Sequence, residues 1–205
     1  LCDRRQRQMC IRDSTWFGKT GKTDTLLSVI MRKRGNIYQS DGERAPNKEK
    51  PAALFAKGSV GITDSNKAGA SLRLYRNNTT EPGNPTQTHG DSGLRDRKTV
   101  QNDVQFWYQY APVDNSLINV KSTLYLSDIT IKTNGHNKTA EWRNNRTSGV
   151  NVVNRSHTLI FPGAHQLSYG AEYYRQQQKP EGSATLYPEG NIDFTSVSYT
   201  HLRAH

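Results

Sequence analysis

The residues at positions 18–23, Gly-Lys-Thr-Gly-Lys-Thr, are the run in this chain that most resembles a phosphate-binding motif. A P-loop cradles phosphates with glycine-rich backbone, and its first glycine stands five places before the second. The residue five places before Gly21 is Trp16, and the segment that follows alternates instead of showing a helical period. The run therefore predicts a polar turn and not a nucleotide site.

Four histidines invite a metal or haem interpretation. His89 and His136 lie in long polar stretches, from which they could reach a ligand such as haem iron. Neither has a second ligating residue at a metal-site spacing, so we expect both to be solvated. His157 in a strand and His165 in a short turn are predicted to be structural. The sequence thus predicts no metal and no cofactor, and it leaves the ligand-binding residues unknown.

Asparagine triplets of the form Asn-x-Ser/Thr recur along the chain, as they do at glycan acceptors of secreted eukaryotic proteins. They begin at Asn77, Asn78, Asn137, Asn145 and Asn154. Segments this rich in Asn and Thr produce such triplets by composition, and we interpret them so.

The net charge of +10 raises the question of a nucleic-acid partner. The basic residues are scattered and balanced locally by acids, as at residues 41–44 and 95–97, and no basic stripe carries interleaved aromatic residues. We therefore expect no nucleic-acid partner. No spacing of serines, acids and histidines implies a nucleophile with its base, so the chain is not predicted to be an enzyme.

The two ends of the chain differ in character from its middle. The runs RQRQMCIRDS at residues 5–14 and VSYTHLRAH at residues 197–205 resemble translated sequencing-adapter read-through. We expect residues 1–14 and 197–205 to be artefact tails, and residues 15–196 to be a segment truncated at both ends. The expected tails contain four residues of types that can bind metals, and we therefore exclude them as candidate ligands: Cys2, Cys10, His201 and His205.

The composition between these ends is too polar for an ordinary soluble core. Only 33% of residues are hydrophobic and the mean hydropathy is −0.86. Disorder is a poor explanation because aromatic residues are plentiful and sit in alternating segments. A structure that buries only every second residue fits better. No apolar run approaches the ~20 residues that a membrane helix needs.

A two-residue period recurs in seven segments and predicts seven β-strands. In the clearest, Phe106 and Tyr108 alternate with Gln105 and Gln109. The seven predicted strands are residues 25–33, 53–62, 67–76, 99–110, 117–131, 147–158 and 166–176.

The predicted connections alternate between short turns and long polar stretches. The short turns are residues 18–24, 63–66, 111–116 and 160–165, and the long stretches are residues 34–51, 77–98, 132–146 and 177 onward. Short periplasmic turns and long extracellular loops are typical of outer-membrane barrels. Hydrocarbon forces every backbone group to be paired, so such strands form a closed ring with an apolar outer face.

Aromatic residues also gather just before one short turn, where a periplasmic girdle belongs. They are Phe106, Trp107, Tyr108 and Tyr110, followed by Pro112. The predicted fold is therefore all-β, an antiparallel up-and-down meander of about seven strands that forms an open part of a transmembrane β-barrel.

From about Trp16 to Thr195 the chain resembles the barrel of TonB-dependent outer-membrane receptors, especially the haem, haemoglobin and transferrin receptor group. Three runs carry the resemblance: residues 26–29 leading into 34–36 and 40–42, residues 67–76, and residues 169–174 leading into 186–190. The last run, a Gly-x-Glu-Tyr-Tyr strand, is the most specific of these.

The resemblance implies a barrel of about 22 strands closed by an N-terminal plug. It implies a fragment of an outer-membrane receptor for uptake of an iron source, with haem or a haem- or iron-carrying protein as the first choice. The implied partners are the outer-membrane lipid, TonB through a missing N-terminal region, and the cargo at the extracellular loops. No family site residue transfers onto a position of this chain.

Two alternatives remain open. One is a passive porin-type barrel, which only the plug would distinguish from a receptor. The other is a soluble, secreted β-rich binding module, in which Val104, Phe106 and Leu124 would face a second sheet.

Overall fold

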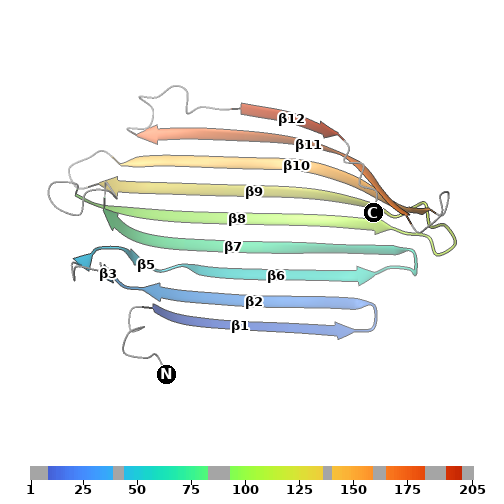
Figure 1. Cartoon of the computed structure of the whole chain (residues 1–205), viewed down its shortest axis with the longest axis horizontal. Coiled ribbons are helices and arrows are strands. Elements are labelled where there is room, and N and C mark those ends of the chain that lie inside the picture. Colours follow the sequence, from blue (N-terminus) through green and yellow to red (C-terminus); the bar gives the residue numbers. More distant parts are fainter. Residues whose placement is uncertain are drawn as a thin grey trace.

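The computed structural model describes residues 9–38, 44–82, 93–135, 140–158, 165–182 and 193–199, and long antiparallel strands dominate them (Figure 1). The long strands are β1 (Met9–Thr20), β2 (Thr23–Arg34), β6 (Ala52–Gly61), β7 (Asn66–Pro82), β8 (Leu94–Tyr110), β9 (Val120–Gly135), β10 (Glu141–Thr158), β11 (His165–Gly182) and β12 (Asp193–Tyr199). Three short strands lie between β2 and β6: β3 (Ile37–Tyr38), β4 (Arg44–Ala45) and β5 (Lys48–Glu49).

The strands pair in chain order, each antiparallel to the next, which is an up-and-down meander. β5 and β6 occupy one position between β2 and β7, because Lys48 pairs with Thr80 and Ala52 with Arg76 in one continuous register. Pro51 lies at the break between them, where its missing N–H cannot donate to the ladder. The small β3–β4 pair forms a separate two-stranded sheet.

All seven predicted strands are confirmed, as β2, β6, β7, β8, β9, β10 and β11. The predicted number is too low, because β1 and β12 add a strand at each edge. The predicted turn at residues 18–24 is too long, because β1 continues to Thr20 and β2 begins at Thr23, so the structure turns only at Gly21 and Lys22. β1 and β12 also enter residues 9–14 and 197–199, and the assignment of those residues to tails stays a prediction.

Several predicted loops are wrong because the strands continue far beyond their apolar portions. β7 and β8 pair from Asn66–Tyr110 to Pro82–Leu94, so much of the expected loop at residues 77–98 is paired strand. The loop expected at residues 132–146 is also largely strand, because β9 continues to Gly135 and β10 begins at Glu141. Polar residues occupy both faces of these extensions, so no hydrophobic alternation marks them, although backbone hydrogen bonds hold them.

The connection between β8 and β9 is longer than the predicted turn at residues 111–116, since β9 begins at Val120. The side chain of Asn154 on β10 explains the late start. Its Nδ2 donates to the Leu117 carbonyl oxygen at 3.0 Å, and its Oδ1 accepts from the Asn119 backbone N–H at 2.8 Å. These bonds hold residues of the connection against β10 in place of a β8–β9 ladder.

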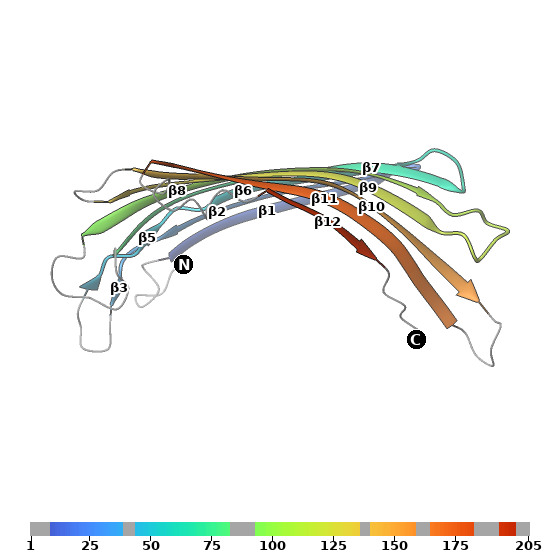
Figure 2. The ribbon, with the colours of Figure 1, turned by 90° about the horizontal axis from the view of Figure 1, so that it is seen from above.

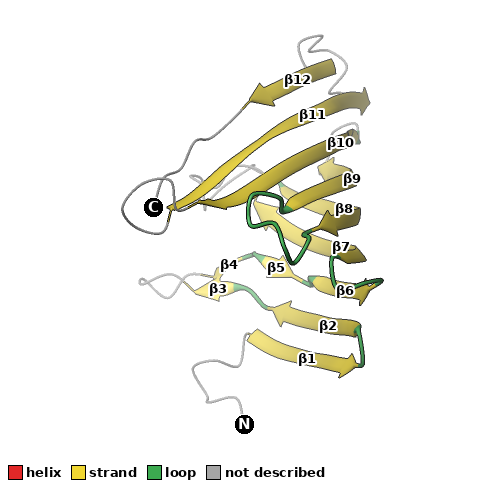
Figure 3. Ribbon diagram, turned by 90° about the vertical axis from the view of Figure 1, so that its right-hand side faces the viewer, coloured by secondary structure: helices red, strands yellow, loops and turns green. Residues whose placement is uncertain are grey.

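The sheet is one layer thick and bends into an arch (Figures 2 and 3). Within the described ranges, no large side chain is fully buried, so this part of the chain has no conventional hydrophobic core. The described residues include no helix long and apolar enough to cross a membrane. Backbone pairing and contacts between side chains of neighbouring strands therefore carry the stability of this sheet.

Candidate functional site: the two faces of the sheet

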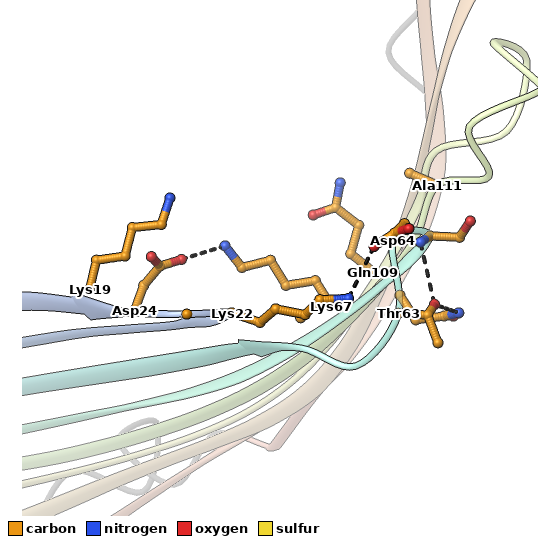
Figure 4. Close-up of a pocket in the computed structure, with 12 residues that line it drawn as sticks. Lys19, Lys22, Asp24, Thr63, Asp64, Lys67, Gln109 and Ala111 are labelled. Carbon is orange, nitrogen blue, oxygen red and sulfur yellow. Dashed lines mark hydrogen bonds and ion pairs between the residues drawn. The ribbon is translucent and has the colours of Figure 1, made fainter.

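Paired residues on neighbouring antiparallel strands share a face, so the registers divide the side chains into two sets. Figure 4 places Lys19, Asp24 and Lys67 on the side toward which the strands curve, which we call the concave face. Residues of the other parity, such as Phe106 and its partner Leu124, lie on the convex face.

The convex face is apolar along much of its length, and its side chains are exposed. Phe106 is 55% exposed and Leu124 58%, although both are large and hydrophobic. Further exposed apolar residues on this face are Leu27, Met31, Val60, Tyr108, Leu126, Val152, Tyr169 and Tyr173. An exposed apolar surface spread over so many strands indicates a nonpolar neighbour. In the described part of the chain, no second sheet covers Phe106 and Leu124, as a soluble sandwich would require.

The concave face carries a hydrogen-bonded polar network instead. Arg73 on β7 binds Asp103 on β8, with 2.6 Å between the guanidinium nitrogen and the carboxylate oxygen. The same carboxylate accepts the Ser127 hydroxyl at 2.5 Å and the Gln101 amide at 2.9 Å. Three neighbouring strands are thus joined through one acid. Such charge-assisted bonds satisfy polar groups on a wall that is in contact with water.

Two large aromatic side chains of the concave face lie against glycines of the adjacent strand. A Cβ added at Gly69 would meet the Trp107 ring at 2.5 Å, and Lys121 Nζ lies 4.8 Å from the centroid of that ring. Tyr125 covers Gly149 in the same way and donates to Glu172 Oε1 at 2.8 Å. The predicted girdle is therefore wrong for Trp107, which lies on the polar face, because strand alternation separates it from Phe106 and Tyr108.

A hollow of about 370 Å³ lies on the concave side, at the end of the sheet with the β1–β2 and β6–β7 turns (Figure 4). Lys67 Nζ lies 2.7 Å from Asp24 Oδ2, and Lys22 Nζ lies 3.0 Å from Asp64 Oδ1. These ion pairs are well exposed, so they add little stability. The hollow is a solvated polar rim, and within the described ranges no three His, Cys, Asp or Glu side chains gather to hold a metal ion.

The residues singled out in the sequence do not converge on one site. Gly21, in the phosphate-like run, has φ +57° in the β1–β2 turn, and a strand follows it, as the polar-turn interpretation predicts. His157 lies in β10, exposed, and its backbone pairs with Ser116. His165 begins β11, whereas His89, His136 and His201 lie outside the described residues.

The asparagines of the Asn-x-Ser/Thr triplets lie largely in strands. Asn154 is only 8% exposed, and its amide also donates to the Tyr169 hydroxyl at 2.7 Å. Asn77 and Asn145 have buried side-chain oxygens that lack a hydrogen-bond partner in the structure. These three asparagines are only partly accessible within paired strands, which disfavours them as glycan acceptors and agrees with a compositional origin of their triplets; Asn78 is exposed, and Asn137 lies outside the described residues. Sequence motifs do not reveal the role of Asn154, whose signal in the sequence is a polar residue at an apolar-parity position of its strand.

Comparison with known proteins gives two close matches in sequence. The chain is 37% identical over 184 residues to a protein named hemin receptor from Yersinia pestis, and 36% identical over 185 residues to a hemin receptor from Yersinia enterocolitica. Each match covers 88% of this chain and 27% of the relative. The chain thus spans about a quarter of the length of these curated relatives. No family model matches the chain.

A solved structure shares the fold. It is a double mutant of the hemophore receptor HasR of Serratia marcescens, in complex with its hemophore HasA and heme. It matches with a TM-score of 0.70 and 18% identity, over 84% of this chain and 25% of that protein. The chain is a homologue of hemin receptors, with the fold of a TonB-dependent receptor barrel.

The fold of a receptor barrel gives each face of this sheet a position in a barrel wall. The convex apolar face corresponds to the outside of a barrel wall and the concave polar face to its interior. The relatives are named as receptors, in agreement with the prediction that the chain is not an enzyme.

Proposed function

We propose that this chain forms part of the wall of a bacterial outer-membrane receptor that takes up haem, or a haem- or iron-carrying protein, with energy supplied through TonB. The observation that carries the proposal is the identity of 37% to a hemin receptor over 88% of the chain. The exposed apolar convex face, opposite a polar hydrogen-bonded concave face, supports the placement in a membrane.

Cargo binding is assigned to the end of the sheet opposite the short β1–β2 and β6–β7 turns. There the strands β7 and β8 extend together beyond the apolar rows as far as Pro82 and Leu94. Long extensions and loops on the extracellular side are typical of outer-membrane receptors. No described residue is assigned as a cargo ligand.

The experiment is growth on haem. The full-length protein that carries this chain is expressed in a bacterium that lacks its own haem receptors, with haemin as the only iron source. Growth that requires both the protein and TonB supports the proposal. Growth without TonB would favour the passive porin-type barrel, and no growth on haemin, with normal growth on an iron salt, would overturn haem as the cargo.

We also propose that residues 15–196 are the receptor segment and that residues 1–14 and 197–205 are tails of foreign origin. The match to the Yersinia pestis relative covers 88% of this chain of 205 residues, which leaves about 25 residues outside it, enough for the 23 residues of the two tails. This is tested by sequencing genomic DNA outward from primers within the codons of residues 15–196. The DNA that flanks these codons is expected to encode sequences that differ from both tails. Recovery of the same codons for residues 5–14 and 197–205 would overturn it.

A further inference from the structure

Beyond its apolar rows, the convex face becomes cationic at the extended end of the sheet. Asn78 pairs with Lys98, and Lys98 pairs with Lys132, so one row crosses β7, β8 and β9. Lys50 joins the row through its backbone N–H, which donates to the Asn78 carbonyl oxygen at 3.0 Å. Lys48 lies on the same face two residues earlier. We call these four lysines, Lys48, Lys50, Lys98 and Lys132, the convex lysine cluster.

Strand parity places the convex lysine cluster on the side of the sheet that carries the apolar surface. Lys98 has the parity of Val104 and Phe106 on β8, and Lys132 has that of Leu124 and Leu126 on β9. The opposite end of this face differs, since the described convex residues in the rows of Phe106, Tyr108 and Tyr110 include no charged side chain. Between the apolar rows and the lysines, the row of Asn102 carries a convex ion pair of Arg146 with Asp128 at 3.2 Å, so the apolar band ends at that row and the lysines gather beyond it.

The four lysines lack carboxylate partners among the residues that the structure describes. Asp96 is the acid among the described residues that line this hollow; it shares a convex row with Lys48 through Thr80, whose hydroxyl it accepts at 2.7 Å. Arg97 lines the same hollow but pairs with Glu81 at 2.7 Å. All four lysines are exposed around this open hollow of about 400 Å³. Four clustered cations with one acid form a local positive field that favours an anion.

The row also contains a residue typical of a membrane interface. Lys132 pairs with Trp142, and its Nζ lies 4.0 Å from the centroid of the indole ring. Tryptophan and lysine gather where hydrocarbon meets headgroups, because the ring is amphipathic and the lysine stem reaches the polar layer. Strands ~4.8 Å apart place Lys98 and Lys132 within reach of one phosphorylated headgroup.

We propose that the convex lysine cluster binds the phosphate groups of anionic lipid headgroups in the outer leaflet of the membrane. The inference rests on the proposed function, since it requires that the extended end of the sheet faces the cell exterior. The lipid is a glycolipid of the lipid A kind, with phosphomonoesters on its headgroup. Its acyl chains would lie along the apolar rows of the convex face. The bound lipid would fix the height of the barrel wall in the membrane.

The test uses the full-length protein purified in a neutral detergent and titrated with bisphosphorylated lipid A, with native mass spectrometry as the readout. Lys98→Gln combined with Lys132→Gln removes two of the four charges. The matched control is Lys57→Gln combined with Lys121→Gln, which removes two exposed lysines from the concave face. A parallel titration contains millimolar inorganic phosphate as a competitor.

The convex variant is expected to bind lipid A about 30-fold more weakly, because each replaced lysine loses its attraction to a headgroup phosphate. The control variant is expected to bind lipid A nearly as tightly as the unmodified protein. Equal binding by both variants, or equal weakening in both, would overturn the proposal. Displacement of lipid A by inorganic phosphate would also overturn it, in favour of a site for free anions. Growth of the convex variant on haemin distinguishes the lipid site from the proposed receptor function. If this variant grows on haemin and binds lipid A as tightly as the unmodified protein, only the lipid site is overturned.

Discussion

Replacement of Phe106 by arginine tests the assignment of the faces most sharply. Phe106 is 55% exposed on the convex face, between Val104 and Tyr108 of the same parity. Gln105, its neighbour in the chain, is exposed on the concave face and accepts the Ser71 hydroxyl at 3.3 Å. The pair Phe106→Arg and Gln105→Arg therefore places the same charge at the same height on opposite faces.

The expected difference follows from the cost of a charge in hydrocarbon. Arginine on the lipid face near the midplane destabilises a barrel by about 2–4 kcal/mol. That corresponds to a loss of roughly 30- to 700-fold in the folding equilibrium. On the concave face the guanidinium stays in water, and surface substitutions of that kind change stability by about 0.5 kcal/mol or less.

The assay is reversible urea unfolding of the full-length protein in lipid vesicles, followed by tryptophan fluorescence. Phe106→Arg should lower the free energy of unfolding by the amount above, and Gln105→Arg should leave it nearly unchanged. Leu124→Arg, in the paired position on β9, should reproduce the effect of Phe106→Arg. The reasoning is refuted if Gln105→Arg costs as much as Phe106→Arg, because the two faces would then have the same surroundings.

Two further substitutions test contacts within the sheet. Gly69→Val should cost about 1–3 kcal/mol of folding free energy, since its Cβ would lie 2.6 Å from the Gly58 carbonyl oxygen and 2.5 Å from the Trp107 ring. Urea midpoints check this, and an equal loss in the neighbouring Ala70→Val would contradict it. Asn154→Leu should cost about 1–3 kcal/mol, because the Leu117 carbonyl and the Asn119 N–H lose their partner. Asn102→Leu on the exposed convex face is the control, and a similar cost there would argue against a specific role for Asn154.

The sequence predicted those strands in which one face is apolar and the other polar. In β8 the alternation of Phe106 and Tyr108 with Gln105 and Gln109 reports the pleat directly, so the strand was found and its faces were assigned correctly. The same signal vanishes from Leu94 to Lys98, where both faces lie beyond the apolar rows. There only the backbone ladder with β7 defines the strand, and backbone pairing leaves no mark on residue type.

The candidate site was less accessible to prediction because its contacts join residues from different strands. The carboxylate of Asp103 gathers Arg73 and Ser127 only through the registers of β7, β8 and β9. The convex lysine cluster has the same origin, since Lys50, Lys98 and Lys132 are far apart in the chain. Spacing along one segment cannot reveal a row that runs across strands. Two signals are present in the sequence: the glycines under Trp107 and Tyr125, because glycine within a strand often marks close approach, and the polar Asn154 at an apolar-parity position.

Lipid accessibility along one strand tests the central claim most directly. Single nitroxide labels at successive positions from Asn102 to Gln109 of β8, in the full-length protein in a bilayer with its other cysteines replaced by serine, report collisions with oxygen and with a water-soluble nickel complex. A two-residue period is predicted, with oxygen contact highest at Val104, Phe106 and Tyr108 and nickel contact highest at Asp103 and Gln105. Uniform access of the nickel complex to both sets would contradict a barrel wall with lipid on its convex face and water on its concave face.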